Sequence, residues 1–143
     1  MNIGKFHVLI VHFPIALGFC AVLADLLWLV TRKNRFRDAG IYCLVLAAIS
    51  AVPVVITGLA VAGSQEFVGD YLSIVTAHKY LGIASFIIAG LAAGIRFGCR
   101  QQLKRWWLVG YCILMLALVA AIALTGHYGG MLVHGKNFLS GIF

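Results

Sequence analysis

Five histidines are the side chains of this chain best suited to chemistry. They are His7, His12, His78, His127 and His134. Imidazole ligates haem iron, zinc and copper, and its proton exchanges near neutral pH. A single histidine at a membrane surface is more often an interfacial side chain than a ligand. Only the arrangement of the five as a set can therefore indicate a site.

The elements that must position these histidines are membrane spans. Of the 143 residues, 63% are hydrophobic and 10% are charged, and the mean hydropathy is +1.03. An ordinary soluble protein has about 25% charged residues, so a soluble domain and a disordered chain are both excluded. A span takes about 20 apolar residues, which leaves room for four spans and short loops. We predict an all-α integral membrane four-helix bundle, a single transmembrane domain over 1–143, with helices at about 7–31, 39–62, 74–98 and 106–126.

The basic residues indicate the orientation of this bundle. Eight of the eleven fall in two loops that lie on the same side: Arg32, Lys33, Arg35, Arg37, Arg96, Arg100, Lys104 and Arg105. The positive-inside rule makes these loops cytoplasmic and both termini periplasmic. We expect a multi-pass protein of the bacterial cytoplasmic membrane. Because topology explains the net charge of +7, the bilayer is the expected partner and nucleic acid is not.

Three of the histidines fall at one depth in the predicted bundle. At 1.5 Å per residue, His12, His78 and His127 lie about 28, 27 and 31 Å from the cytoplasmic ends of their helices. The hydrocarbon core is about 30 Å thick, so these three form one layer at its outer edge. His7 and His134 lie just beyond that layer. Ionisable groups in membrane spans tend to be functional, and five histidines on one face favour a ligand role.

Haem b is the cofactor that this layer favours, because imidazoles from different helices can hold the iron between them. We predict that two of His12, His78 and His127 are the ligands, with His7 and His134 as second choices. His7 and His12 are about 140° apart around a regular helix and cannot share one iron. One of the two could therefore serve a second haem or hydrogen-bond a propionate, so one or two haems are expected. A c-type haem is excluded because no Cys-x-x-Cys-His is present.

Other residues could complete such a site. Gly82 lies one turn after His78 and would make room for a macrocycle, and Lys79 could pair with a haem propionate. Pro14 either starts the first helix or kinks it. Asp25, the acidic residue clearly inside a span, is expected to pair with a loop arginine, with a proton relay as the alternative. We find no internal repeat.

Two motifs carry a resemblance to a known family. They are Val11-His12-Phe13-Pro14-Ile15-Ala16-Leu17 and Thr125-Gly126-His127-Tyr128-Gly129-Gly130-Met131-Leu132-Val133. With His78 opening the third helix, the chain resembles a bacterial family of four-helix membrane proteins whose function is not known. Members resembling this sequence occur alone or joined to Rieske iron–sulfur or cytochrome c modules, which implies redox work on the outer face. Val8 and His134 depart from the family's usual proline and tyrosine.

The sequence thus favours a b-type cytochrome subunit with a bis-histidine haem near the periplasmic surface. It would pass electrons between a quinol pool or membrane partner and a periplasmic cytochrome c or Rieske-type protein. No nucleophile–base pair or phosphate loop is present, so catalysis by the chain alone is not expected. Two alternatives remain open: a non-redox anchor or assembly subunit of a larger complex, and a copper- or zinc-binding membrane protein.

Overall fold

The chain folds into four long helices. The computed structural model describes residues 3–99 and 105–136, with α1 at Ile3–Thr31, α2 at Asn34–Ser64, α3 at Asp70–Gly98 and α4 at Arg105–His134. Each helix is long and apolar enough to cross a membrane. The described ranges contain no strand. The predicted all-α four-helix membrane bundle is confirmed.

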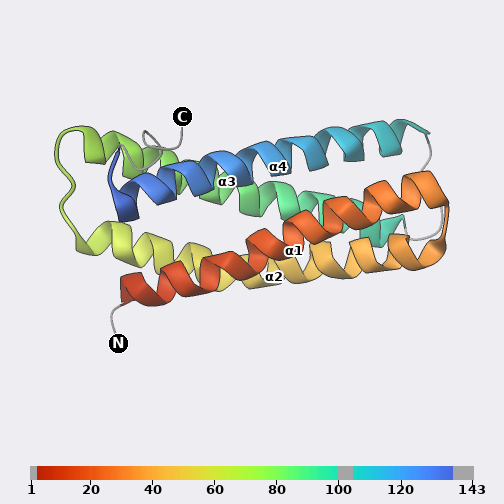
Figure 1. Cartoon of the computed structure of the whole chain (residues 1–143), viewed down its shortest axis with the longest axis horizontal. Helices are drawn as coiled ribbons and strands as arrows, with labels where there is room; N and C mark the ends of the chain where they lie inside the picture. Colours follow the sequence, from red (N-terminus) through yellow and green to blue (C-terminus); the bar gives the residue numbers. More distant parts are fainter. Residues whose placement is uncertain (1–2, 100–104, 137–143) are drawn as a thin grey trace.

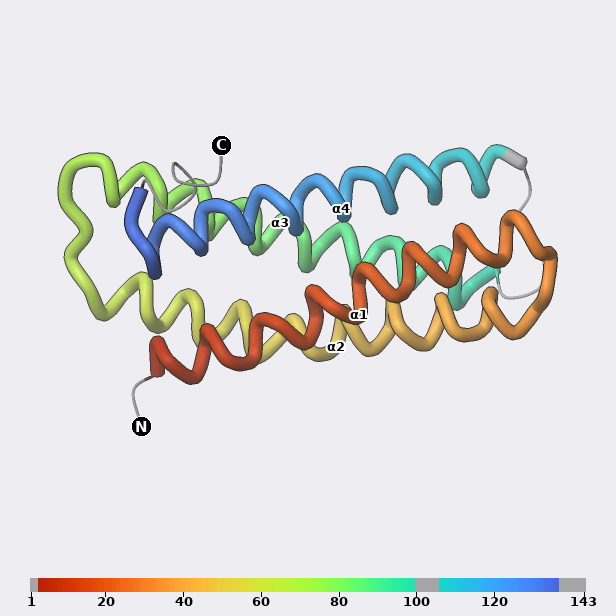
Figure 2. Tube along the Cα trace, in the orientation of Figure 1, coloured from red at the N-terminus to blue at the C-terminus, as the bar shows by residue number. Residues whose placement is uncertain are grey.

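The helices pair into two hairpins that lie as two layers (Figure 1). Packing is most extensive within each hairpin, between α1 and α2 and between α3 and α4. The layers meet mainly along α2 and α3, whereas α1 and α4 touch only sparsely. In Figure 2 the start of α1, the end of α4 and the loop before α3 lie at one end of the bundle, and the turn between α1 and α2 lies at the other.

Four helix boundaries differ from the expected ones by four residues or more, and one of them is the start of α3, at Asp70 and not at 74. α1 begins at Ile3 and continues through Pro14, so this proline does not start the helix. α2 begins at Asn34, before the expected position 39. α4 continues past position 126 to His134, through Gly129 and other residues of low helix propensity. In a bilayer every backbone amide must find an internal partner, so a helix persists through such residues.

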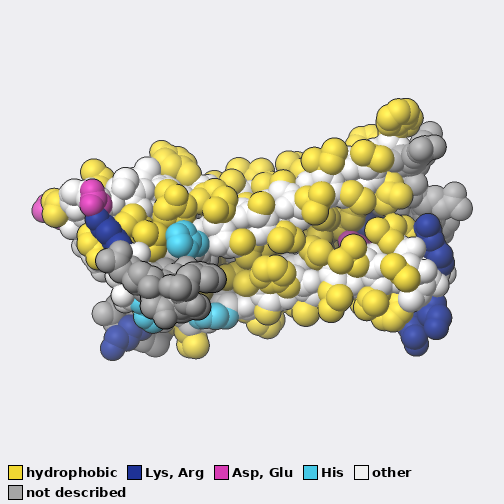
Figure 3. All heavy atoms as spheres, turned by 45° about the horizontal axis from the view of Figure 1, so that its top comes forward, with side chains coloured by type: hydrophobic (Ala, Val, Ile, Leu, Met, Phe, Trp, Pro, Cys, Tyr) yellow, Lys and Arg dark blue, Asp and Glu magenta, His cyan; other side chains and the backbone are white. Residues whose placement is uncertain are grey.

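Small side chains form much of the core, as in other membrane bundles. The buried cluster consists of Ala21, Leu44, Ala89, Ala92, Ala93, Tyr111, Met115 and Leu118. Large apolar side chains cover the outside (Figure 3). Lipid is as apolar as leucine, so helix association depends on close packing, which small residues permit.

A two-residue turn joins the helices of the first hairpin. α1 ends at Thr31 because Arg32 adopts a left-handed conformation with φ of +58°, and its amide donates to the carbonyl of Trp28 at 2.8 Å. Lys33 is extended and caps α2. The turn therefore reverses the chain in the shortest possible space.

Candidate cofactor site between the hairpins

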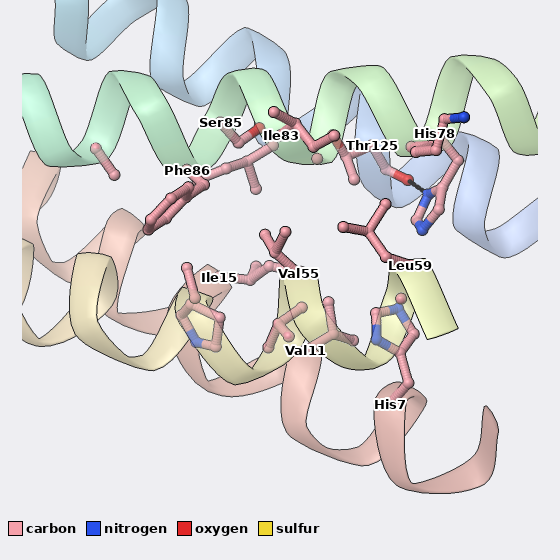
Figure 4. A pocket seen from close by; sticks show the side chains of 18 of the residues that line it. His7, Val11, Ile15, Val55, Leu59, His78, Ile83, Ser85, Phe86 and Thr125 are labelled. Atoms are coloured by element: carbon pink, nitrogen blue, oxygen red, sulfur yellow. Dashed lines mark hydrogen bonds between the residues drawn. The ribbon is translucent and has the colours of Figure 1, made fainter. Parts of the chain in front are cut away.

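Two imidazoles face each other across the gap between the layers. His7 extends from α1 and His78 from α3, and both are half-buried. Figure 4 shows the two rings reaching toward each other from opposite walls of a cavity. Their centroids are 6.4 Å apart and their planes are 88° apart. Each hairpin thus contributes one imidazole to the same place.

The second helix of the first hairpin holds the His7 ring. Nδ1 of His7 lies 3.0 Å from Oγ1 of Thr57, and that hydroxyl donates to the carbonyl of Pro53 at 2.8 Å. Because the hydroxyl proton is already used, we assign the His7 Nδ1 proton as the donor to Thr57. The lone pair of a neutral ring is then on Nε2. A Cβ at Gly58 would lie 2.9 Å from Cε1 of this ring, so the glycine is what lets His7 approach α2.

The second hairpin holds the His78 ring in the same way. Nδ1 of His78 donates to the carbonyl of Thr125 at 2.9 Å, because a carbonyl can only accept. Nε2 again keeps the lone pair. A Cβ at Gly129 would lie 3.0 Å from Cε1 of this ring. Each imidazole therefore rests on a glycine, is oriented by a threonine, and has the same tautomer.

The spacing of the histidines does not predict this repeated use of a threonine and a glycine beside each imidazole. The partner helices carry Thr57-Gly58 and Thr125-Gly126 at corresponding places. This pair of dipeptides is the one sequence signal that could have pointed to the two imidazole supports. Gly58, which directly follows Thr57, contacts the His7 ring. In α4 the glycine that contacts the His78 ring is Gly129, one turn after Thr125.

Two adjoining hollows flank the imidazole pair. One runs between the layers toward the middle of the bundle, with a cavity volume of about 170 Å³, and the other opens toward the chain ends, with about 290 Å³. Together they reach the size of small-molecule sites, which is about 300–1,000 Å³. They share six lining residues: His7, Val11, Ile15, His78, Thr125 and Leu132. The imidazoles therefore stand where the two hollows meet.

The remaining histidines lie outside this pair. His12 is exposed, and its Nδ1 lies 2.8 Å from the carbonyl of Val8 one turn earlier in α1. His127 is exposed, with its ring edge against Tyr128 at 5.7 Å between centroids. His134 is the last residue of α4. His12 and His134 line the outer hollow, whereas His127 lines neither hollow.

The two other predicted site residues both line the inner hollow. Lys79 has its ammonium 4.9 Å from the centre of the Tyr80 ring. Gly82 is half-buried, and a Cβ there would meet Thr125 only at ordinary contact distance, 3.8 Å. No three or more His, Cys, Asp or Glu side chains converge as a metal site among residues 3–99 and 105–136. The two imidazoles are thus a pair, without a third protein ligand of these types in that part of the chain.

A second polar cluster occupies the opposite end of the bundle. Asp25 accepts from Nη2 of Arg96 at 2.7 Å and, through its other oxygen, from the hydroxyl of Tyr111. The Arg96 guanidinium lies about 5 Å from the ring centres of Trp28 and Tyr111. The expected arginine partner of Asp25 is therefore found, but Arg96 lies inside α3 and is 1% exposed, not in a loop. We call Asp25, Arg96 and Tyr111 the charge cluster.

The fold and the paired imidazoles define a four-helix membrane protein with a potential ligand site at one end. Residues 5–138 match a family described as a predicted membrane protein, DUF2231. The chain belongs to this family. No curated protein and no solved structure matches it.

Proposed function

We propose that this protein is a b-type cytochrome subunit in which His7 and His78 ligate one haem between the two hairpins. The observation that carries the proposal is the imidazole pair. The ring centroids are 6.4 Å apart, a separation that would allow both imidazoles to bond one metal ion at about 2.0–2.1 Å. Among the pairings suggested by the sequence, this geometry favours His7 as the partner of His78 over His12 and His127.

The surroundings of the pair suit a planar macrocycle. The two hollows extend to either side of the axis that joins the rings, and their walls are mainly apolar. When bound, the haem would supply one-electron redox chemistry.

A threonine side chain of α2 and a backbone carbonyl of α4 would orient the two ligands. A histidine ligand usually donates its other ring N–H to an oxygen, which fixes the tautomer and the ring direction. Thr57 and the carbonyl of Thr125 accept these protons. Lys79, on the cavity wall, would pair with a propionate.

The direction of electron flow follows from the expected orientation. The positive-inside rule puts the turn between α1 and α2 in the cytoplasm and the imidazole pair at the periplasmic surface. A quinol in the bilayer would supply electrons, and a periplasmic cytochrome c or Rieske-type protein would accept them. The chain would then work as an electron-transfer subunit of a complex in the bacterial cytoplasmic membrane, and not as an enzyme by itself.

A reduced-minus-oxidised optical spectrum of the purified protein, with iron quantified per chain, tests the proposal. We expect b-haem Soret and α bands at one haem per chain, lost in His7→Ala and in His78→Ala. The matched controls are His12→Ala and His127→Ala, which should retain the bands. Absence of the bands after haem loading would contradict the proposal. Bound copper or zinc in place of iron would favour a metal-binding protein, and no metal at all would favour an anchor role.

A further inference from the structure

The inner hollow extends well beyond the imidazole pair. It is lined along α1 from His7 to Gly18 and along α3 from His78 to Ala89. Each stretch covers twelve residues, and the rise from its first to its last residue is about 16 Å of helix. A macrocycle centred between the rings would fill only the outer part of this length. The inner part would still be open to an elongated apolar molecule.

The walls of the inner part are almost wholly apolar. In Figure 4 the space between α3 and the first hairpin is bordered by Val11, Ile15, Val55 and Phe86. A phospholipid headgroup carries charges that would be costly to place there. A molecule with a neutral headgroup on an apolar tail could enter without burying a charge.

The polar atoms beyond the imidazoles act as hydrogen-bond acceptors. The hydroxyl of Ser85 donates to the carbonyl of Leu81 at 2.8 Å, and that of Thr125 donates to the carbonyl of Ala121 at 2.7 Å. Each hydroxyl has thereby used its only proton and offers lone pairs. A ligand that donates protons is the complement of such a site, so a dihydroxy ring fits better than a dicarbonyl ring. Ser85 lies seven residues, or about 10 Å, inward of His78.

The sparse contact between α1 and α4 gives such a ligand a route from the bilayer. The two helices approach closely at Gly18, where a Cβ would lie 3.0 Å from Ile122. The outer hollow is lined by residues of these same two helices together with His78. A lipid-soluble molecule can therefore enter sideways between α1 and α4.

We propose that the inner hollow binds an isoprenoid quinol, with its ring hydroxyls donating to Ser85 and Thr125 and its tail along the apolar wall toward Ala89. Binding does not require haem, whereas the role of this quinol as electron donor rests on the proposed function. The site would hold the donor within the same cavity as the redox centre.

Binding of decyl-hydroquinone, under anaerobic conditions, to purified protein in detergent tests this inference. The dissociation constant should be lower for decyl-hydroquinone than for decyl-quinone or decanol, because only the hydroquinone both donates two protons and fills the ring volume. Ser85→Ala should weaken hydroquinone binding roughly 2- to 10-fold, the range for one lost hydrogen bond. Ser73→Ala, whose hydroxyl bonds Asp70 on the same helix outside the hollow, is the matched control and should bind normally.

A blocking variant provides a second measurement. Ala51→Phe places a ring in the hollow and should abolish binding, whereas Ala117→Phe on the exposed side of α4 should not. Equal affinity for decanol and decyl-hydroquinone, or unchanged binding in both Ser85→Ala and Ala51→Phe, would overturn the inference. If the protein binds hydroquinone but takes up no haem, the inference stands and the proposed function is contradicted. If the protein takes up haem but does not bind hydroquinone, the proposed function stands and the inference is contradicted.

Discussion

The two ends of the bundle use polar side chains in opposite ways. In the charge cluster, Asp25 and Arg96 lie in contact and are almost fully buried. At the other end, His7 and His78 spend one nitrogen each on a threonine and leave the other beside a cavity. The charge cluster satisfies its own groups, apart from Nε of Arg96, which has no hydrogen-bond partner in the described part of the chain. The imidazole pair retains capacity for a ligand.

Glycine has a matching role at both ends. A Cβ at Gly40 would lie 2.7 Å from Oδ1 of Asp25, as a Cβ at Gly58 or Gly129 would crowd an imidazole. Close approach of helices therefore supports both polar groups. The difference lies in what remains open: four helices close around the charge cluster, whereas the imidazoles stand between two hollows. The contact between opposite charges favours a structural role for the charge cluster, and the unused lone pairs beside the hollows are what the proposed ligand site requires.

The largest expected effect comes from breaking the charge cluster. Arg96→Met leaves the Asp25 carboxylate buried without its cation, which should lower the free energy of unfolding by about 3–5 kcal/mol. The measurement is an unfolding titration in mixed micelles. The double variant Asp25→Leu, Arg96→Met should recover most of the loss, since an apolar replacement of a buried pair is often neutral. A single variant as stable as the parent would contradict the structural role.

A smaller effect is expected from crowding the imidazole pair. Gly58→Val should lower the free energy of unfolding by about 1–3 kcal/mol through overpacking against His7, and haem content should fall with it. Gly63→Val, at a position in α2 where an added Cβ meets nothing within 4 Å, is the control. The same comparison in α4 is Gly129→Val against Gly110→Val, where an added Cβ also meets nothing within 4 Å. If both members of each pair behave alike in unfolding and haem assays, the glycine supports do not exist as described.

The smallest effect is expected at His12. Its ring is exposed, and its Nδ1 bonds the carbonyl of Val8 one turn earlier in α1. His12→Gln should therefore change the free energy of unfolding by less than about 0.5 kcal/mol, as surface substitutions usually do. The haem spectrum should also be unchanged. A lost α band in this variant would move the ligand assignment from His7 to His12.

Composition and hydropathy were sufficient for the fold class, because the bilayer imposes it. They were less informative on helix ends. Thr125-Gly126-His127 and the glycines after it suggest a loop by propensity, yet α4 continues to His134. α1 also begins at Ile3, four residues before the expected position 7, so His7 lies in its second turn and not at its first residue.

The imidazole pair itself could not be deduced from depth alone. Depth groups His12, His78 and His127, but it does not say which way each ring points around its helix. The pairing of His7 with His78 depends on the packing of α1 on α2 and α3 on α4, which brings Gly58 and Gly129 beneath the rings. The partner of Asp25 could be predicted in part. An arginine was expected, and Arg96 is that arginine, but it lies in the last turn of α3 and not in a loop.

The short turn at Arg32 and Lys33 fixes how far along α2 the residue beside His7 must lie. His7 lies 24 residues before Thr31 and Gly58 lies 24 residues after Asn34, so both are equally far from the turn. In the second hairpin His78 lies 20 residues before Gly98 and Thr125 lies 20 after Arg105. One residue inserted in α2 near the turn would shift Gly58 by 1.5 Å and rotate it by about 100°. Turns between helices usually tolerate insertions. The turn at Arg32 and Lys33 is instead held to a fixed length by the His7 imidazole, some 36 Å away along α1.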